Sequence, residues 1–278
     1  MINGQTVLYA IIGNPVEHSL SPILHNGAFR RMGLNAAYLA FKVRDLEDAL
    51  RGIRGLGIQG VSVTLPFKTK VIPFLDDVEE VAREIRAVNT IVNQRGRMIG
   101  YNTDWHGALE ALEEKIDLRG KRVLLLGAGG AARAIAFGLK RRDCQVTLSN
   151  RTVERGKALA NELGFLYRPW LSIEEMEEDV LINTTSVGMS PHDEESPVPK
   201  KVLKEGMTVM DIVYRPLRTK LLREAEERGS LTINGLEMLA RQGAAQLEIW
   251  TGRRPDIGEI KEDLYRALAI GINREEND

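Results

Sequence analysis

A set of polar side chains that could bind and react with a small molecule is spaced along the first part of the chain. Most of them follow short apolar runs that are expected to form strands, whereas Asn89 and Thr90 lie within the segment Ala87–Thr90. The members are Ser19, Ser21, Thr64, Lys68, Asn89, Thr90 and Asp104. In open α/β sheets, ligands bind at the carboxyl ends of the strands. A collection of hydroxyls, amides, one amine and one carboxylate suits a small polyhydroxylated acid there, and suits an apolar ligand poorly.

Two members of this set, Lys68 and Asp104, could act as a proton-transfer pair. Hydride addition to a carbonyl leaves an alkoxide, which an ammonium group can stabilise and protonate. A carboxylate can hold that ammonium group in place. Each residue taken singly also has an ordinary structural explanation, as a solvated lysine and as a helix cap. His18 and His25 lie near the serines, and fit hydrogen-bonded structural residues as well as they fit a site.

A glycine-rich turn between a strand and a helix predicts a dinucleotide site. The run Val123–Leu126 is typical of a buried parallel strand, and a helix is expected over 131–139. Between them, Gly127 allows a tight turn and Gly129 lets the backbone approach phosphates. Ala132 is small enough for the helix to pack on the strand. The amide groups at the helix start then favour the pyrophosphate.

The end of the next expected strand favours NADP over NAD. An NAD-type fingerprint has an acidic residue there, about 20 residues after the glycines, which binds the ribose 2′-hydroxyl. Here the strand is followed by Asn150, Arg151 and Thr152, with Arg155 one turn later. Asn150 can bond to the ribose, and the two guanidinium groups can pair with a 2′-phosphate. The alternative is that both arginines belong to a solvated helix face near Glu154.

The pattern of apolar runs predicts two α/β series. In the first, strands are expected over 7–12, 37–43, 61–64, 88–92 and 97–101. Helices are expected from a Ser21 cap to Met32, after an Asp45 cap, and over 76–85. Repeated strand–helix–strand units imply a parallel sheet, and residues 93–96 indicate a hairpin-like connection.

The second series begins at the glycine turn. Its strands are expected over 123–126, 146–149, 180–183, 208–213 and 231–233. Thr152 and the capping-box sequence at 172–175 are expected helix starts, and residues 190–200 are expected to form an exposed loop. Two further helices, over 236–250 and 256–270, follow this complete series and could return to the first domain.

Composition excludes several other classes of protein. The 278 residues are 43% hydrophobic and 28% charged, as in globular proteins. Balanced charge, with 38 basic and 39 acidic residues, offers no general attraction to nucleic acid or an anionic membrane. The single cysteine, Cys144, and four dispersed histidines predict no disulfide and no metal site. Without a long apolar run, a signal-peptide pattern or a G-x-S-x-G elbow, we expect a cytoplasmic protein that is not a serine hydrolase.

A series of motifs spread over nearly the whole chain resembles the shikimate dehydrogenase family. In the first half these are Gly13–Pro15 with Ser19–Pro22, Val63–Lys68, Ala87–Thr90 and Gly100–Asp104. In the second half they are Gly127–Ala131, Asn150–Thr152, Asn183–Met189 and Gly235–Leu239. The resemblance implies a two-domain α/β fold: an α/β substrate domain over 1–104, completed by helices over 239–278, and a Rossmann-type NADP domain over 105–238.

The resemblance also implies an activity and a set of site residues. The activity is the reversible, NADP(H)-dependent reduction of 3-dehydroshikimate to shikimate, a step towards chorismate and the aromatic amino acids. Ser19 and Ser21 would hold the substrate carboxylate with Tyr214 near it, and Lys68 and Asp104 would be the catalytic pair. Ring hydroxyls would be bound by Thr64, Lys68, Asn89, Asp104 and Gln242. Cofactor-binding residues would be Gly127, Ala128, Gly129, Gly130, Ala131, Asn150, Arg151, Thr152, Arg155, Thr185, Val213, Gly235 and Met238.

Two positions on the expected helix over 236–250 bear on the resemblance, and two alternative functions stay open. Gln242 fits the family motif and nearby Gln246 does not, while Leu247 replaces an aromatic residue common in the family. One alternative is a quinate/shikimate dehydrogenase with relaxed cofactor use. The other is a non-catalytic, dinucleotide-sensing regulator on the same scaffold, which would be expected to lack Lys68 or Asp104. The sequence is compatible with a monomer or a homodimer.

Overall fold

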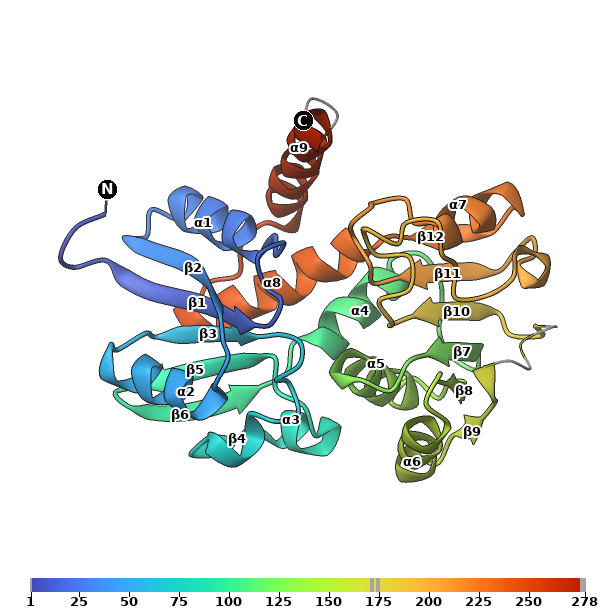
Figure 1. Cartoon of the computed structure of the whole chain (residues 1–278), viewed down its shortest axis with the longest axis horizontal. Coiled ribbons are helices and arrows are strands. Elements are labelled where there is room, and N and C mark those ends of the chain that lie inside the picture. The colour runs from blue at the N-terminus through green and yellow to red at the C-terminus, as the bar shows by residue number, and fades with distance from the viewer. Residues whose placement is uncertain (1, 171–172, 174–175, 276–278) are drawn as a thin grey trace. The chain divides into compact units, whose positions relative to one another are not determined.

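The chain forms two compact units, each built on one sheet (Figure 1). A computed structural model describes residues 2–170, 173 and 176–275. Unit 1 comprises Met1–Thr103 and Ala240–Asp278, and unit 2 comprises Asp104–Leu239. None of the helices in the described ranges combines the length and the hydropathy needed to cross a bilayer.

Unit 2 contains a six-stranded, fully parallel sheet. Its strand order is β12-β11-β10-β7-β8-β9. The chain begins at the central strand β7, adds β8 and β9 on one side, and then adds β10, β11 and β12 on the other side. This order is that of a dinucleotide-binding Rossmann sheet. The strands are β7 (Arg122–Leu126), β8 (Gln145–Ser149), β9 (Leu166–Tyr167), β10 (Val180–Asn183), β11 (Thr208–Asp211) and β12 (Leu231–Ile233). The predicted Rossmann-type domain is therefore confirmed.

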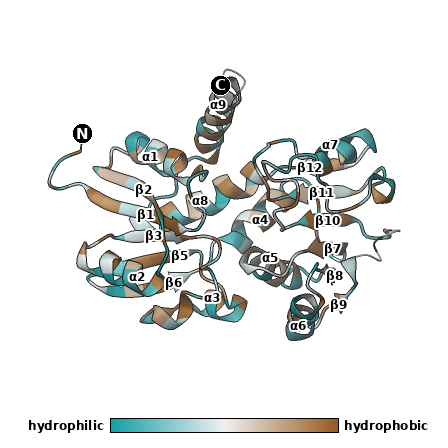
Figure 2. Ribbon diagram, in the orientation of Figure 1, coloured by the Kyte–Doolittle hydropathy of each residue, from teal (hydrophilic) through white to brown (hydrophobic). Residues whose placement is uncertain are grey.

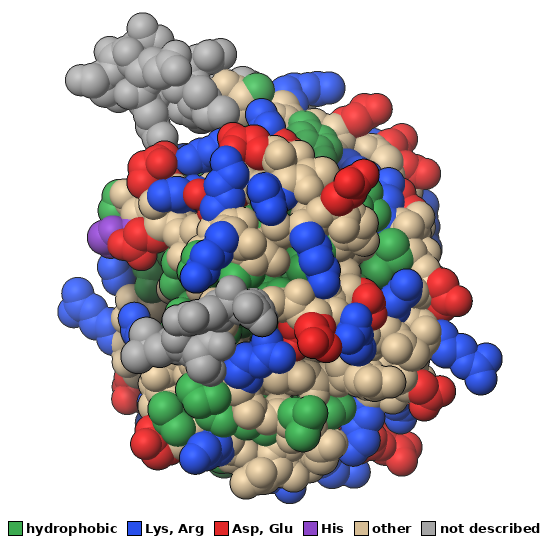
Figure 3. Space-filling view, turned by 90° about the vertical axis from the view of Figure 1, so that its right-hand side faces the viewer, with side chains coloured by type: hydrophobic (Ala, Val, Ile, Leu, Met, Phe, Trp, Pro, Cys, Tyr) green, Lys and Arg blue, Asp and Glu red, His purple; other side chains and the backbone are tan. Residues whose placement is uncertain are grey.

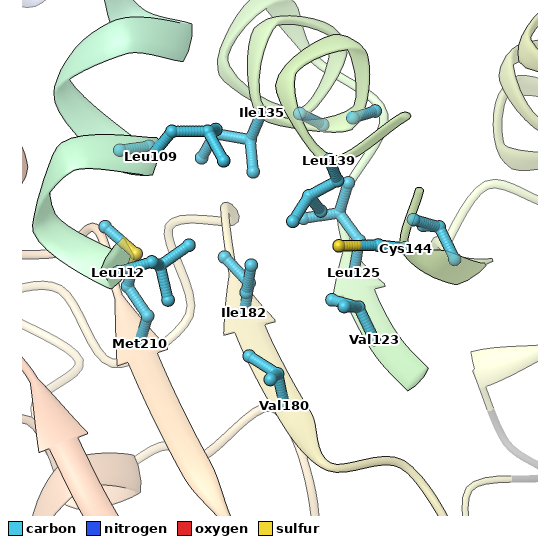
Figure 4. Packing of buried hydrophobic residues seen from close by; sticks show 14 of the residues in the cluster. Leu109, Leu112, Val123, Leu125, Ile135, Leu139, Cys144, Val180, Ile182 and Met210 are labelled. Carbon is cyan, nitrogen blue, oxygen red and sulfur yellow. The ribbon is translucent and has the colours of Figure 1, made fainter. Parts of the chain in front are cut away.

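Alternation along the central strand divides the core of unit 2 between the two faces of its sheet. Val123 and Leu125 face one side, where Leu109 and Ile135 cover them (Figure 4). Leu124 belongs to the cluster on the opposite face. The helices of this unit are α4 (Asp104–Glu113), α5 (Gly130–Lys140), α6 (Val153–Leu163) and α7 (Lys220–Glu227), with a 3₁₀ turn η3 (Lys200–Val202). In Figure 2, β7 and β10 have the colour of hydrophobic residues, whereas α6 and α7 carry many hydrophilic residues.

Cys144 lies at the edge of this core, directly before β8. Its Sγ donates to the Leu118 carbonyl at 3.2 Å, and burial raises the pKa of the thiol to about 11. Because the thiolate is the reactive form, this cysteine has the environment of a structural residue.

Unit 1 contains a mixed six-stranded sheet of order β2-β1-β3-β5-β6-β4. The strands are β1 (Val7–Gly13), β2 (Ala36–Lys42), β3 (Gly60–Val63), β4 (Asp77–Val78), β5 (Thr90–Gln94) and β6 (Arg97–Tyr101). The first three are parallel, as predicted, and the predicted hairpin of β5 and β6 is confirmed. The relation between β3 and β5 was not predicted: β5 runs antiparallel to β3, so the sheet as a whole is mixed.

Helices cover both faces of the unit 1 sheet. They are α1 (Ser21–Arg31), α2 (Leu46–Gly55), α3 (Glu80–Ile85), the end of α8 (Gly235–Thr251) and α9 (Ile257–Glu275), with a 3₁₀ turn η1 (Ile72–Phe74). From α8, Trp250 donates its indole N–H to the Ile91 carbonyl at 3.0 Å and its ring lies 5.2 Å from that of Tyr9. The C-terminal helices thus complete the first unit, as the fold prediction stated.

Several predicted helix starts differ in the structure. Ser21 is the first residue of α1 and not its cap, since Leu20 occupies that position without a side-chain bond. The helix predicted over 76–85 begins only at Glu80, because the Asp76 amide and carboxylate both bond to the Met98 backbone and keep this segment beside β6. Asp45 caps α2 as predicted. Thr152 stands at the N-cap of α6 without a side-chain bond, and most of the proposed capping box at 172–175 lies outside the described residues.

Candidate functional site

The antiparallel position of β5 brings three predicted site segments of unit 1 to one edge of its sheet. The carboxyl end of β3 leads to Thr64, while the amino end of β5 follows Asn89. Asn89 O accepts from the Val63 amide at 2.7 Å. Lys68 O accepts from the Val88 amide, also at 2.7 Å. The backbone therefore holds Thr64, Lys68 and Asn89 next to one another, although β5 contributes its amino end and not the expected carboxyl end.

The two serines after β1 lie at the start of α1. The Ser21 amide donates to Ser19 Oγ at 3.2 Å, and the Ser21 hydroxyl bonds to the buried Tyr38 hydroxyl. The Asn14 amide donates to Leu65 O at 2.8 Å, which ties the chain after β1 to the segment after β3. These contacts bring the predicted carboxylate-binding serines towards the same edge.

A buried amide pair forms the centre of this edge. Asn89 Nδ2 donates to Gln242 Oε1 at 3.3 Å and to Thr103 Oγ1 at 3.0 Å. Asn89 Oδ1 accepts from the Thr103 amide at 2.8 Å. The structure thus joins two residues predicted for ring-hydroxyl binding, which lie far apart in the sequence. Lys68 belongs to unit 1 and Asp104 to unit 2, so their pairing stays a prediction.

Sequence analysis missed the residue that supports this pair from behind. Gln246 lies one helical turn after Gln242 on α8 and is almost completely buried. Its Oε1 accepts from Ser62 Oγ at 2.8 Å and lies 3.2 Å from His25 Nε2. Its Nε2 donates to Asn89 O at 3.1 Å and to Thr90 Oγ1 at 2.9 Å. A serine in the middle of an apolar strand was the available signal that a polar partner lies close by.

His25 is part of this buried structure. Its ring stacks on Tyr38 with centroids 4.2 Å apart, and it is fully buried. Burial lowers the pKa of His25 to about 3, so the ring is neutral at physiological pH. The hydrogen-bonded structural interpretation of this histidine fits the structure.

The glycine turn of unit 2 has the geometry of a phosphate site. Gly127 adopts φ +118°, and a Cβ there would clash with the Thr184 hydroxyl. Gly129 is the N-cap of α5, and a Cβ at this position would meet open space. Because the cap has no side chain, the first amide groups of α5 can bond to an incoming anion. Ala132 is fully buried, as the fingerprint requires.

The two arginines predicted for the 2′-phosphate have no side-chain partner within the described parts of the chain. Arg151 and Arg155 are both exposed and make no ion pair there, including with Glu154. In contrast, Arg133 on α5 is neutralised by a two-bond pair with Glu162, at 2.7 and 3.1 Å. Exposed arginines agree both with a 2′-phosphate contact and with a solvated helix face, so the assignment of Arg151 and Arg155 stays a prediction.

A buried carboxylate organises the other predicted cofactor loops of unit 2. Asp211, at the end of β11, accepts from the Val213 amide at 3.0 Å, from Thr219 Oγ1 at 2.7 Å and from Asn183 Nδ2 at 3.0 Å. Asn183 Oδ1 in turn accepts from the amide and hydroxyl of Thr185 at 3.0 and 2.7 Å. Asp211 was not among the predicted residues, although it fixes two that were, Thr185 and Val213.

The remaining predicted residues are distributed over unit 2. Gly235 begins α8, where a Cβ would clash with the Ile212 and Val213 carbonyls. Met238 packs into the core of the unit, and Tyr214 is half-buried after β11. Among the described side chains there is no group of three or more His, Cys, Asp or Glu residues suited to a metal ion.

Comparison with known proteins agrees with this arrangement. Residues 11–91 match a model of the shikimate dehydrogenase substrate binding domain, residues 109–214 a model named shikimate/quinate 5-dehydrogenase, and residues 235–265 a model of the shikimate 5′-dehydrogenase C-terminal domain. The chain is 47% identical to a shikimate dehydrogenase (NADP(+)) of Pyrococcus furiosus, and the match covers 99% of both proteins. This chain belongs to the shikimate dehydrogenase family. The resemblance inferred from its motifs is confirmed.

Solved structures of family members have the same fold. A crystal structure of a shikimate dehydrogenase in complex with NADP+ matches with a TM-score of 0.91 and 42% identity, covering 96% of this chain and 98% of that one. The enzyme of Thermus thermophilus, in complex with NADP(H) and shikimate, matches with a TM-score of 0.88 and 41% identity, covering 95% of this chain and 100% of that one.

The buried Asp211 generates a prediction about pH and stability. Burial raises the pKa of its carboxyl from 3.8 to about 7, so the folded state binds this proton more tightly than the unfolded state. Its contribution to the free energy of unfolding is therefore largest below about pH 4 and declines as pH rises to about 7. Each unit of pKa separation corresponds to about 1.4 kcal/mol.

Urea unfolding of the wild type and Asp211→Asn between pH 4.5 and 8 measures this contribution. The variant has no ionisable group at the position, so other titrations cancel in the comparison. We expect the stability of the wild type relative to the variant to fall as pH rises across this window. A constant difference across the whole range would contradict the prediction.

Proposed function

We propose that this protein is an NADP-dependent oxidoreductase that reversibly reduces 3-dehydroshikimate to shikimate. The observation that carries the proposal is the buried Asn89–Gln242 amide pair beside the Thr64 and Lys68 segments of unit 1. Amide groups fixed in this way can recognise vicinal ring hydroxyls. Family membership supports the same substrate, since the related Thermus thermophilus protein was solved with shikimate.

NADP(H) fits the residues of unit 2 as the proposed cofactor. The open space at Gly129 and the uncapped start of α5 suit the pyrophosphate, and Arg151 with Arg155 suits the 2′-phosphate. Asp211 fixes the Thr185 and Val213 segments, which lie at the carboxyl ends of β10 and β11. Those ends are where the rest of a dinucleotide lies in Rossmann sheets.

The proposed mechanism assigns the proton to Lys68. Bound NADPH supplies the hydride that converts the substrate carbonyl into a CH–OH group. As negative charge develops on the carbonyl oxygen, the Lys68 ammonium stabilises it and donates a proton to it. Asp104 orients the ammonium group. In the oxidative direction, neutral Lys68 accepts the proton of the shikimate hydroxyl.

The remaining residues complete the proposed substrate site. Ser19 and Ser21 bind the carboxylate, with Tyr214 close to it, and Thr64 contributes a further bond to a ring hydroxyl. We further propose that the enzyme acts in the cytoplasm, as a monomer or homodimer, on the route to chorismate and the aromatic amino acids. Quinate use is the second candidate, because the model matched by residues 109–214 covers both shikimate and quinate enzymes.

A steady-state assay that crosses shikimate and quinate with NADP+ and NAD+ tests the proposed function. We expect the highest kcat/KM for shikimate with NADP+. Preference for quinate would establish the second candidate instead. Tight NADP binding without turnover of either substrate would indicate the regulatory alternative and refute an enzymatic role.

Lys68→Ala tests the proton-transfer role. We expect kcat to fall by about 10²- to 10⁴-fold, the usual contribution of a general acid or base, while KM for shikimate changes by less than about fivefold. Lys70→Ala is the matched control, because Lys70 is an exposed lysine of the same turn. Near-normal turnover by the Lys68 variant would remove it from the mechanism.

Arg151→Ala tests the 2′-phosphate contact. Loss of one charge-assisted bond should weaken NADP+ binding by about 10- to 100-fold and leave NAD+ binding almost unchanged. Lys157→Ala, which removes an exposed cation from the adjacent helix α6, controls for general electrostatic attraction. Equal losses for NADP+ and NAD+ in the Arg151 variant would defeat the assignment.

A further inference from the structure

The buried polar groups of unit 1 form one continuous chain of hydrogen bonds behind the substrate-binding amides. Tyr38 Oη bonds to Ser62 Oγ at 2.6 Å, and Ser62 Oγ bonds to Gln246 Oε1 at 2.8 Å. Gln246 then bonds to Thr90, and Thr90 Oγ1 bonds to Asn89 Oδ1 at 2.7 Å. Hydroxyl and amide groups can in principle bond in either direction, so the direction of this chain has to be established.

Two backbone groups establish it. The Asn89 carbonyl can only accept, so the Gln246 atom that meets it at 3.1 Å must be the amide nitrogen. Gln246 Oε1 therefore faces Ser62 and His25, and both must donate to it. The Ser62 hydroxyl, whose proton is used in this bond, accepts from Tyr38. His25 consequently carries its proton on Nε2, and its buried Nδ1 has no partner in the described structure.

The second backbone group fixes Asn89 itself. The Thr103 amide can only donate, so the Asn89 atom that meets it at 2.8 Å must be Oδ1. Thr90 Oγ1 accepts from Gln246 Nε2, which leaves its proton for Asn89 Oδ1. Asn89 Nδ2 is thereby turned towards Gln242, and the Gln242 atom that receives it must be Oε1. The carbonyl of Gln242 is used in this bond, and its amide nitrogen is a donor only.

We propose that Thr90 and Gln246 are positioning residues for the reaction, which lock the amides of Asn89 and Gln242 so that Gln242 acts as a hydrogen-bond donor to a ring hydroxyl of the substrate. Neither residue needs to touch the substrate. Without the Thr90 hydroxyl, one acceptor site of Asn89 and one donor of Gln246 lose their partner, and the Thr103 amide alone holds Asn89 Oδ1 in this orientation. This inference rests on the proposed function, because the ring hydroxyls are those of shikimate.

An isosteric pair of variants at Thr90 tests the lock. Thr90→Val keeps the shape of the side chain and removes the hydroxyl that both accepts from Gln246 and donates to Asn89. Thr90→Ser keeps the hydroxyl. We expect Thr90→Val to raise KM for shikimate about tenfold, as for a buried partner left unsatisfied, and Thr90→Ser to stay within about twofold of the wild type. KM for NADP+ should be unchanged in both variants.

Shikimate analogues that each lack one ring hydroxyl sharpen the test. If Thr90 acts through Gln242, the Thr90→Val penalty disappears for the analogue that lacks the hydroxyl bound by Gln242 and persists for the others. A merely structural role would instead give the same penalty for every analogue, or raise KM for shikimate and NADP+ together. Either result, or an unchanged KM for shikimate, would overturn the inference.

Gln246→Glu provides a second route if Thr90→Val does not fold. A glutamate keeps the acceptors for Ser62 and His25 and removes both donors to Asn89 and Thr90. It should therefore raise KM for shikimate with KM for NADP+ unchanged, and an unaltered KM for shikimate would also overturn the inference. Failure of the wild type to turn over shikimate would refute the proposed function, and is distinguishable because it needs no variant.

Discussion

The edge of the unit 1 sheet that carries the proposed substrate site depends on the hydrogen bonds of Asn89. Its backbone carbonyl accepts from Val63 of β3 and from Gln246 of α8, so this one oxygen joins a strand end to a C-terminal helix. Its side chain bonds to Thr90, Thr103 and Gln242. A buried amide has two donors and two acceptor sites to satisfy, and leaving one of them unpaired costs about 1–3 kcal/mol. Asn89 therefore constrains every segment that meets it, and those segments carry the proposed substrate contacts.

Unit 2 follows a simpler constraint, because segments of its chain approach one another closely at glycine residues. Gly127 and Gly235 stand where a side chain would clash with a neighbouring segment, and Gly129 faces open space at the start of α5. The Asp211 carboxylate connects the loops after β10 and β11, because it accepts from Asn183, Val213 and Thr219. Figure 3 shows basic and acidic side chains interspersed over one face, in keeping with the balanced composition. In our proposal, specific cations such as Arg151 provide the preference for one cofactor.

The sequence predicted most of what depends on local pattern. The glycine turn, the parallel Rossmann sheet and the β5–β6 hairpin were predicted from residues close together in the chain, and the family from short motifs spread along it. The mixed sheet of unit 1 was not, because no local pattern states that β5 runs antiparallel to β3. Gln246 and Ser62 were missed for a related reason. A polar residue in an apolar segment shows that a partner is needed, but here the partner lies 184 residues away. The assigned roles of the individual site residues stay predictions that the experiments above address.

The division of the chain between the two units has a consequence for the order of folding. Unit 2 is one unbroken segment, Asp104–Leu239, whereas unit 1 is assembled from both ends of the chain. During synthesis, Ser62, Asn89 and Thr90 leave the ribosome long before Gln246, so for most of that time their buried partner does not exist. Contacts of such large sequence separation form late, since a long loop must close before they repay its entropy. Unit 2 can therefore fold while the nascent chain is still growing, and unit 1 is completed only once the last helices have been made.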